Sequence, residues 1–448
     1  MIGKVSGTPE GRHWHTWRRE VLLLMVAGVF VSASAWALAV TLPTPFSVRT
    51  GVNPDPLLLL CIALWFGAAI TGFIGLQHLG NGHDVILFPS VMILCGWGIV
   101  TIWRLQGVYA LRQAFWVCIG TGVMLVTVRW FHWIIALRKY PYVALLFGAL
   151  LTSLTLIVGV NPSGSGPRLW LGVGGLSFFG SGIYLQPSEL LKPLLVIFLA
   201  AYLSRHGSLL QYGFNNLSSR LPMAFLAPMV VMWSLSLFMV IVQRDMGAGW
   251  VLYWGFLCIF YLATGRRRYV ALGMVLFLIG AALAYFVSEL ARSRIHGWLN
   301  PWSDANGEYY QIVQALKAMA TGGTFGTGIG RGAPEQIPLA HSDFILAAII
   351  NEWGKMGGFA LFILTLIILE RIWVIGYSQG TGSYLRLLVF GVGSFIAVQA
   401  VINISGVLRM MPLTGVPLPF VSYGGSSMVV NFAGIGVVYG YMMRGMRG

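Results

Sequence analysis

The stretch His341-Ser342-Asp343-Phe344-Ile345-Leu346-Ala347-Ala348-Ile349-Ile350 joins a long polar loop to a continuous apolar run. Apolar runs of this kind recur along the chain over roughly 17 to 25 residues, which is the length that an α-helix needs to cross a lipid bilayer. Only 13 of the 448 residues are Asp or Glu, and Asp343 stands at one of these boundaries. A carboxylate at the rim of a membrane costs free energy and usually has a function. The stretch therefore indicates both a membrane-spanning helix and a candidate functional residue.

The composition of the whole chain is typical of a helical membrane protein. Hydrophobic residues make up 57% of the chain and charged residues 9%. A mean hydropathy of +0.79 excludes an ordinary soluble domain. A transmembrane β-barrel is excluded as well, because its strands alternate apolar and polar residues and these apolar runs are continuous. We therefore predict an all-α, polytopic transmembrane protein.

Hydropathy along the chain predicts about twelve membrane spans. They are expected near residues 20–41, 55–77, 84–103, 112–128, 140–160, 186–204, 221–243, 246–263, 268–290, 343–372, 384–407 and 426–443. An even number of spans places both termini on one face, and the excess of Lys and Arg on that face identifies it as cytoplasmic. The net charge of +15 is explained by these basic clusters at helix ends, so no nucleic-acid partner is expected.

The chain divides into three parts by this prediction. Residues 1–19 form a short basic cytoplasmic tail, residues 20–83 hold the first two spans, and residues 84–448 hold the other ten. Within the last part, residues 291–342 form a large extracytoplasmic loop, and a loop of that length usually has a function. It contains the glycine-rich run from Thr321 to Gly332, which either approaches a ligand closely or only crosses the surface in tight turns.

A second unusual segment runs from Met411 to Ser427. Its prolines, Pro412, Pro417 and Pro419, prevent a regular helix, yet the segment is too apolar for a freely solvated loop. Non-helical backbone at membrane depth survives only against protein or a water-filled cavity. We interpret the segment as the re-entrant wall of a cavity.

Several further charges map to the same outer side as Asp343. They are the cations Arg168, Lys192, Arg244 and Arg331 and the acids Glu189 and Asp245. Fixed cations and carboxylates at one face would suit an amphiphilic lipid substrate that carries phosphate. Structural roles remain open: Glu189 and Lys192 share a helix face and could form an ion pair, Arg244 and Asp245 could anchor a turn, and Arg168 could lie at the surface.

Asp343 itself has a structural alternative. A carboxylate at a helix N-cap accepts hydrogen bonds from free backbone N–H groups and complements the helix dipole. Ser342 could supply the same cap, so capping does not require an acid. Glu352, in the same apolar run, could pair with Lys355 one helical turn later or belong to the site.

Four segments, in the right order, closely resemble the SEDS family of bacterial shape, elongation, division and sporulation proteins, which includes FtsW and RodA. They are Gln186-Pro-Ser-Glu-Leu-Leu-Lys192, Gly322-Gly-Thr-Phe-Gly-Thr-Gly328, His341-Ser-Asp-Phe-Ile345 and Gly415-Val-Pro-Leu-Pro-Phe-Val-Ser-Tyr-Gly-Gly-Ser426. The resemblance extends from about residue 84 to the C-terminus. Because family members typically have ten helices, it implies a ten-helix core with two N-terminal helices added.

The resemblance also implies an activity. It implies a peptidoglycan glycosyltransferase that polymerises lipid II at the outer face of the bacterial cytoplasmic membrane, in an elongation or division complex with a class B penicillin-binding protein. The essential acid of the family corresponds to Asp343, and other functional positions of its motifs correspond to Arg168, Glu189, Lys192 and Asp245. His341, Ser422 and Tyr423 lie in the matching motifs and are expected to support the site, together with Glu352.

The expected chemistry accounts for these residue types. A sugar hydroxyl must lose its proton as it attacks the anomeric carbon of a lipid-linked donor, and a positioned carboxylate such as Asp343 can accept it. The departing lipid pyrophosphate needs fixed cations. Arg168, Lys192 and Arg244 are the candidates, with Arg331 in the loop. A single displacement would invert the anomeric centre without a second carboxylate as nucleophile.

No strict metal cluster is visible in the sequence, and the reaction is expected to require no cofactor. Asp343 with Glu308 or Glu335 could nevertheless recruit Mg²⁺ through water. Three other functions remain as alternatives: a lipid II flippase or transporter, another transferase of polyprenyl-linked sugars, and a catalytically silent scaffold. A flippase should have ionisable residues in both halves of the membrane, whereas these charges crowd towards one face, which favours catalysis.

Overall fold

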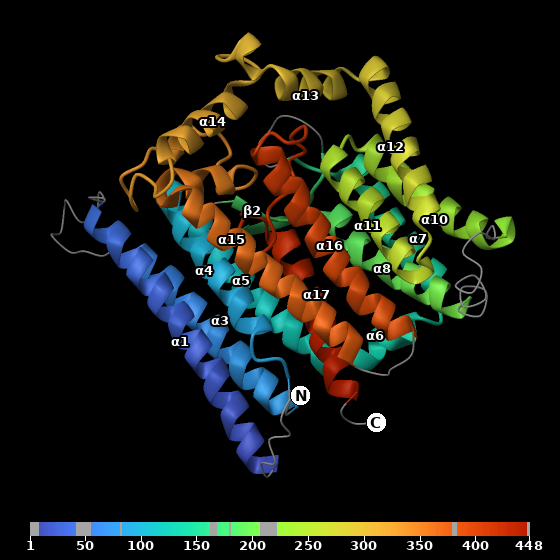
Figure 1. The fold of residues 1–448 in the computed structure, drawn as a ribbon, viewed down its shortest axis with the longest axis horizontal. Helices are drawn as coiled ribbons and strands as arrows, with labels where there is room; N and C mark the ends of the chain where they lie inside the picture. The colour runs from blue at the N-terminus through green and yellow to red at the C-terminus, as the bar shows by residue number, and fades with distance from the viewer. Residues whose placement is uncertain are drawn as a thin grey trace.

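The computed structural model of the protein describes residues 9–41, 55–80, 83–161, 168–178, 181–206, 222–378 and 383–445. In these ranges twelve helices are long and apolar enough to cross a membrane, which confirms the predicted polytopic helical fold. Most of them run from one end of the molecule to the other, while two shorter helices, α13 and α14, lie across one end (Figure 1). We call this the α13–α14 end.

The observed helices lie close to the predicted spans. They are α1 (Pro9–Thr41), α3 (Pro56–Leu79), α4 (Leu87–Leu105), α5 (Gly107–Arg129), α7 (Pro141–Val158), α8 (Pro187–Arg205), α10 (Met223–Val242), α11 (Met246–Thr264), α12 (Arg267–Val287), α15 (Ile345–Ser378), α16 (Ser383–Val407) and α17 (Gly425–Gly445). A short helix, α6 (Phe131–Leu137), follows α5. The largest difference is at the start of the chain, where residues 9–19 of the expected tail belong to α1. Residues 1–8 of that tail lie outside the described residues.

The two N-terminal helices lie at one edge of the bundle, α1 against α4 and α3 against α5 (Figure 1). A buried polar cluster joins them to the rest of the protein. The carboxylate of Glu20 in α1 is fully buried, and its Oε2 lies 2.7 Å from Nε2 of His83, just before α4. The same oxygen accepts a hydrogen bond of 3.0 Å from Gln77 in α3. Because a buried carboxylate is costly without partners, these contacts fix the position of α1.

The connections at the α13–α14 end contain structure that hydropathy did not predict. The loop between α7 and α8 includes an antiparallel hairpin of β1 (Leu171–Phe178) and β2 (Ser181–Leu185), a small exception to the all-α prediction. The predicted loop over residues 291–342 contains two helices, α13 (Glu289–Leu299) and α14 (Tyr310–Gly322). Short 3₁₀ turns follow each of them, at Pro301–Asp304 and Pro334–Gln336.

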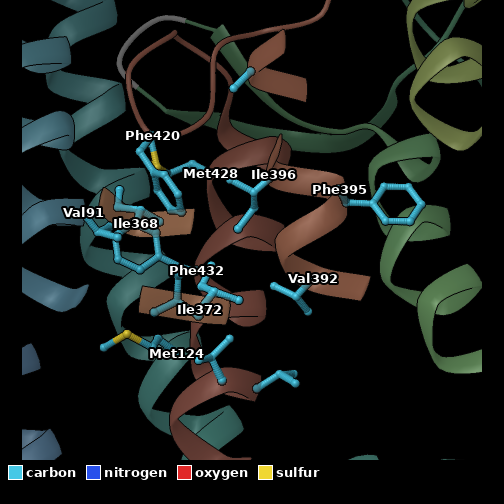
Figure 2. Close-up of a cluster of buried hydrophobic side chains, with 14 of the residues drawn as sticks. Val91, Met124, Ile368, Ile372, Val392, Phe395, Ile396, Phe420, Met428 and Phe432 are labelled. Carbon is cyan, nitrogen blue, oxygen red and sulfur yellow. The ribbon is translucent and has the colours of Figure 1, made fainter. Parts of the chain in front are cut away.

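The proline-rich segment before α17 is non-helical and mostly buried against protein. Its anchor is Phe420, which is 2% exposed and meets Phe432 of α17 edge to face, with ring centroids 5.8 Å apart. Figure 2 shows Phe420 in a cluster with side chains of α15, α16 and α17. Burial of one phenylalanine contributes about 1.5–3 kcal/mol. The segment is thus attached to the core.

Candidate active site

Asp343 lies in the turn that leads into α15, at the α13–α14 end, and is half-buried. Its backbone N–H donates to the carbonyl of Leu339 at 3.2 Å, and its own carbonyl accepts a hydrogen bond of 3.1 Å from Asn403 of α16. Among the described residues, no backbone N–H of α15 donates to the Asp343 carboxylate. The N-cap alternative is therefore not met, and the carboxylate instead interacts with the neighbouring Ser342 side chain.

The proline-rich segment holds this turn in place. The Ser422 hydroxyl donates to the carbonyl of Ser342 at 2.6 Å and accepts a hydrogen bond of 2.9 Å from the N–H of Leu418. The N–H of Tyr423 donates to the carbonyl of His341 at 2.8 Å. Ser422 and Tyr423 therefore position the backbone directly before Asp343 rather than its carboxylate.

An aromatic cluster flanks the turn. The ring of His341 stacks on Tyr109 of α5 with centroids 4.7 Å apart, and Tyr423 contacts both rings. Burial lowers the pKa of His341, so the imidazole is neutral at neutral pH. A neutral ring is suited to packing and hydrogen bonding rather than to binding a phosphate by charge.

Arg294 of α13 and Asp245 are the charged neighbours of Asp343. Burial raises the pKa of the Asp343 carboxylate. The hydrogen bond with Ser342 and the positive charge of Arg294 lower this pKa, and the negative charge of Asp245 raises it. Burial lowers the pKa of Arg294, and both carboxylates oppose that change. Nη1 of Arg294 also donates to the carbonyl of Leu413 at 3.0 Å, which joins α13 to the proline-rich segment. We call Asp343, Asp245 and Arg294 the Asp343 group.

Asp245 caps α11 and links it to α8. Its Oδ1 accepts a hydrogen bond of 2.9 Å from the N–H of Ala248. Its Oδ2 accepts hydrogen bonds from Gln186 at 3.1 Å and from Ser188 at 3.3 Å. Burial raises the pKa of Asp245, whereas the Ala248 hydrogen bond and the charge of Lys192 lower it. The acid thus has a structural role as well as an electrostatic effect on Asp343.

Glu189 and Lys192 form the buried ion pair that their spacing allowed. Nζ of Lys192 lies 2.7 Å from Oε1 of Glu189, and the two side chains are 4% and 6% exposed. The pair lies close enough to influence the pKa of Asp245, so α8 brings it beside the Asp343 group. The ammonium carries three N–H groups, and the described residues engage one of them.

The other three predicted cations are placed differently. Arg168 lies just before β1, Arg244 in the turn before α11, and Arg331 in the glycine-rich run, and all three are exposed. Arg244 has a left-handed backbone with φ of 60°. Within the described ranges, none of the three side chains forms an ion pair with the Asp343 group.

Glu352 pairs with Arg104 of α4, so the suggested pairing with Lys355 is wrong. Nε of Arg104 lies 2.9 Å from Oε1 of Glu352, and Nη2 lies 2.9 Å from Oε2 of Glu335. The position of α4 beside α15 decides this partner. Glu308 accepts a hydrogen bond from Ser293. Both proposed helpers for Mg²⁺ are thus engaged elsewhere, and the described part of the chain contains no group of three potential metal ligands.

The glycine-rich run makes tight turns, with positive φ at Gly326, Gly328 and Gly330, and packs against a break in α15. Helix α15 is interrupted at Gly354, where φ is 71° and ψ is −175°. Around the break, the N–H of Thr327 donates to the carbonyl of Asn351 at 3.0 Å and that of Gly328 to the carbonyl of Glu352 at 3.1 Å. The run satisfies carbonyls that the broken helix leaves free. It thereby sets the direction of the first part of α15, which follows Asp343.

Comparisons with known proteins agree with this architecture. A model of the FtsW, RodA and SpoVE family, described as cell cycle proteins, matches residues 84–444. The chain is 35% identical over 388 residues to the peptidoglycan glycosyltransferase RodA of Mycobacterium tuberculosis, covering 82% of this chain and 80% of that protein. It is 30% identical over 380 residues to a probable peptidoglycan glycosyltransferase FtsW of Geobacter sulfurreducens, covering 80% and 95%.

Solved structures show the same fold. A structure described as a peptidoglycan synthase complex that coordinates polymerization and crosslinking contains a chain with a TM-score of 0.64 and 23% identity, covering 80% of this chain and 97% of that one. The crystal structure of Thermus thermophilus RodA has a TM-score of 0.56 and 22% identity, covering 81% and 97%. The match of the family model begins at residue 84, after α1 and α3.

Proposed function

Because this chain belongs to the SEDS family of FtsW, RodA and SpoVE proteins, we propose that it is a peptidoglycan glycosyltransferase that polymerises lipid II. The observation that supports this function best is the Asp343 group, in which a carboxylate without a capping role lies beside a fixed cation at one end of a membrane bundle. A base next to a cation is the arrangement that glycosyl transfer from a lipid pyrophosphate requires.

Asp343 acts as the general base in this mechanism. Burial raises its pKa, which makes the ionised carboxylate a stronger base than that of an exposed aspartate. It accepts the proton of a sugar hydroxyl as the hydroxyl oxygen forms a bond to the anomeric carbon of the lipid-linked donor. The bond from that carbon to the pyrophosphate breaks in the same step, so the anomeric configuration inverts. No second carboxylate is needed as a nucleophile.

The departing undecaprenyl pyrophosphate is stabilised by cations at the same end of the bundle. Arg294 is proposed to bind the pyrophosphate. Its side chain is held by the hydrogen bond to Leu413, and its positive charge lies beside Asp343. Lys192 is proposed to contribute through N–H groups not engaged by Glu189. The exposed Arg168, Arg244 and Arg331 are proposed to meet the pyrophosphate only when substrate is bound.

We also propose an orientation in the membrane, a partner protein and a metal requirement. The α13–α14 end is placed outside the bacterial cytoplasmic membrane and both termini inside, as the basic residues suggest. A class B penicillin-binding protein is the expected partner in an elongation or division complex. No resident metal is proposed, and Mg²⁺ carried with the pyrophosphate is the alternative. Polymerisation measured in EDTA and then with added Mg²⁺ separates the two.

The deciding experiment supplies fluorescent lipid II to the purified protein, alone and with the candidate penicillin-binding protein, and measures glycan length on a gel. Long glycan strands are expected with the partner present. A flippase would form no polymer and would instead move lipid II across the bilayer of a sealed vesicle, which a membrane-impermeant quencher detects. A scaffold would do neither.

Changing the two charged neighbours of Asp343 should shift the pH dependence of polymerisation in opposite directions. If the ionised carboxylate is the base, the rate falls as the pH drops through its pKa. Arg294→Gln removes a cation that lowers this pKa, so the acid limb should move to higher pH. Asp245→Asn removes a like charge, so the limb should move to lower pH. Initial rates across pH measure both shifts, and movement in the same direction would contradict the assignment.

A further inference from the structure

A cavity of about 540 Å³ lies at the end of the bundle opposite Asp343. Helix α17 begins at Gly425, two residues after Tyr423, and ends at Gly445. At 1.5 Å per residue, it separates the two ends of the bundle by about 30 Å. Arg444, in the last turn of α17, lines the cavity. The cavity is therefore independent of the proposed catalytic site.

Four helices contribute basic or potentially basic side chains to this cavity. They are His78 of α3, Arg129 of α5, His132 of α6 and Arg444 of α17. Among the residues that the structure describes, the lining contains no aspartate or glutamate. None of the four side chains forms an ion pair with a carboxylate in the described ranges. Positive charge is thus concentrated around a hollow to which the described residues contribute no carboxylate.

The floor of the cavity is apolar. Phe131 and Met443 line it and are each 6% exposed, and Leu79 and Val128 lie beside them. Cations at helix C-termini can also complement helix dipoles or anchor a protein in the membrane. Neither of these roles requires that the cations surround a cavity. A cationic rim over an apolar floor matches an amphiphilic anion, whose charged group meets the arginines while its apolar part covers the floor.

We propose that this cavity binds a phosphate-bearing anion. The apolar floor favours the head group of an anionic phospholipid, and a free phosphorylated solute is the other source of the same chemistry. One wall, His78 and Leu79, comes from α3, which precedes the region that the family model matches. Helix α3 would then complete a ligand site that the matched region alone does not form.

Thermal unfolding of the full-length protein in detergent tests the proposal, because a ligand that binds the folded state raises Tm. The probes are dihexanoyl phosphatidylglycerol, its zwitterionic phosphatidylcholine counterpart, and inorganic phosphate at constant ionic strength. The test variant is R129Q/R444Q. Its matched control is K139Q/R386Q, which removes the same charge from exposed residues outside the cavity lining. Tyr384 donates to Ile134 of α6, so Arg386 lies near the same end.

Phosphatidylglycerol should raise the Tm of the native protein more than phosphatidylcholine does. The phosphatidylglycerol concentration that gives half of the rise in Tm should increase roughly thirtyfold in R129Q/R444Q, because each cation near an anionic head group contributes about 1 kcal/mol. It should stay within about twofold in K139Q/R386Q, and R129K/R444K should restore binding. If inorganic phosphate raises Tm and phosphatidylglycerol does not, the site exists and its ligand is a free phosphorylated solute. Equal losses in both glutamine variants, or no stabilisation of the native protein by either anion, would overturn it.

Discussion

Asp343→Asn is expected to slow lipid II polymerisation by about a hundred- to ten-thousand-fold, the usual contribution of a positioned general base. Asparagine keeps the size of the side chain and cannot accept the proton of the attacking hydroxyl. The fold should tolerate the change, because no backbone N–H of α15 in the described structure depends on the carboxylate. The measurement is the initial rate of glycan formation from fluorescent lipid II, together with the Tm of each protein.

Glu289→Gln is the matched control for this prediction. Glu289 is an exposed acid at the start of α13, at the same end of the bundle, and its loss should leave the rate unchanged. A folded Asp343→Asn protein that polymerises at the native rate would falsify the assignment of Asp343 as the base. Equal losses in both variants would indicate an effect of overall charge instead.

Gly354→Ala is expected to destabilise the protein by about 3 kcal/mol or more, because two costs combine at this position. The backbone has φ of 71° and ψ of −175°, a region that is essentially restricted to glycine. An added Cβ would also lie 2.3 Å from the carbonyl oxygen of Thr324 and 2.4 Å from the nitrogen of Gly326. Both atoms belong to the backbone, so neither can rotate away. The break in α15 and the glycine-rich run must then separate.

The effect should appear as a lower Tm and as slower polymerisation, since the first part of α15 directs the turn that carries Asp343. Gly280→Ala in α12 is the control, because an added Cβ there meets no atom within 4 Å. Replacement of a helical glycine at an open position should be neutral or stabilising by up to about 1 kcal/mol. A Tm for Gly354→Ala no lower than for Gly280→Ala would contradict the packing described for the glycine-rich run.

The membrane spans were predictable from the sequence because they depend on local properties. A helix crosses the bilayer when about 20 consecutive residues are apolar, whatever its neighbours are. The Glu189–Lys192 pair was predictable for the same reason, since spacing along one helix brings the two side chains together. The start of α1 at Pro9 was not predictable from the sequence. Residues 9–19 are mostly polar and lack the hydropathy on which the span prediction relied.

The sequence by itself therefore determined the class of protein and the number of spans, and its motifs indicated Asp343 as the candidate catalytic acid. Tertiary structure alone decided which side chains meet it. Arg294 joins the site because α13 folds across the end of the bundle, and Glu352 pairs with Arg104, a residue 248 positions away. The run from Thr321 to Gly332 acquires its role only against the broken α15. Such contacts depend on how helices pack in three dimensions, and no local pattern of hydropathy or spacing encodes them.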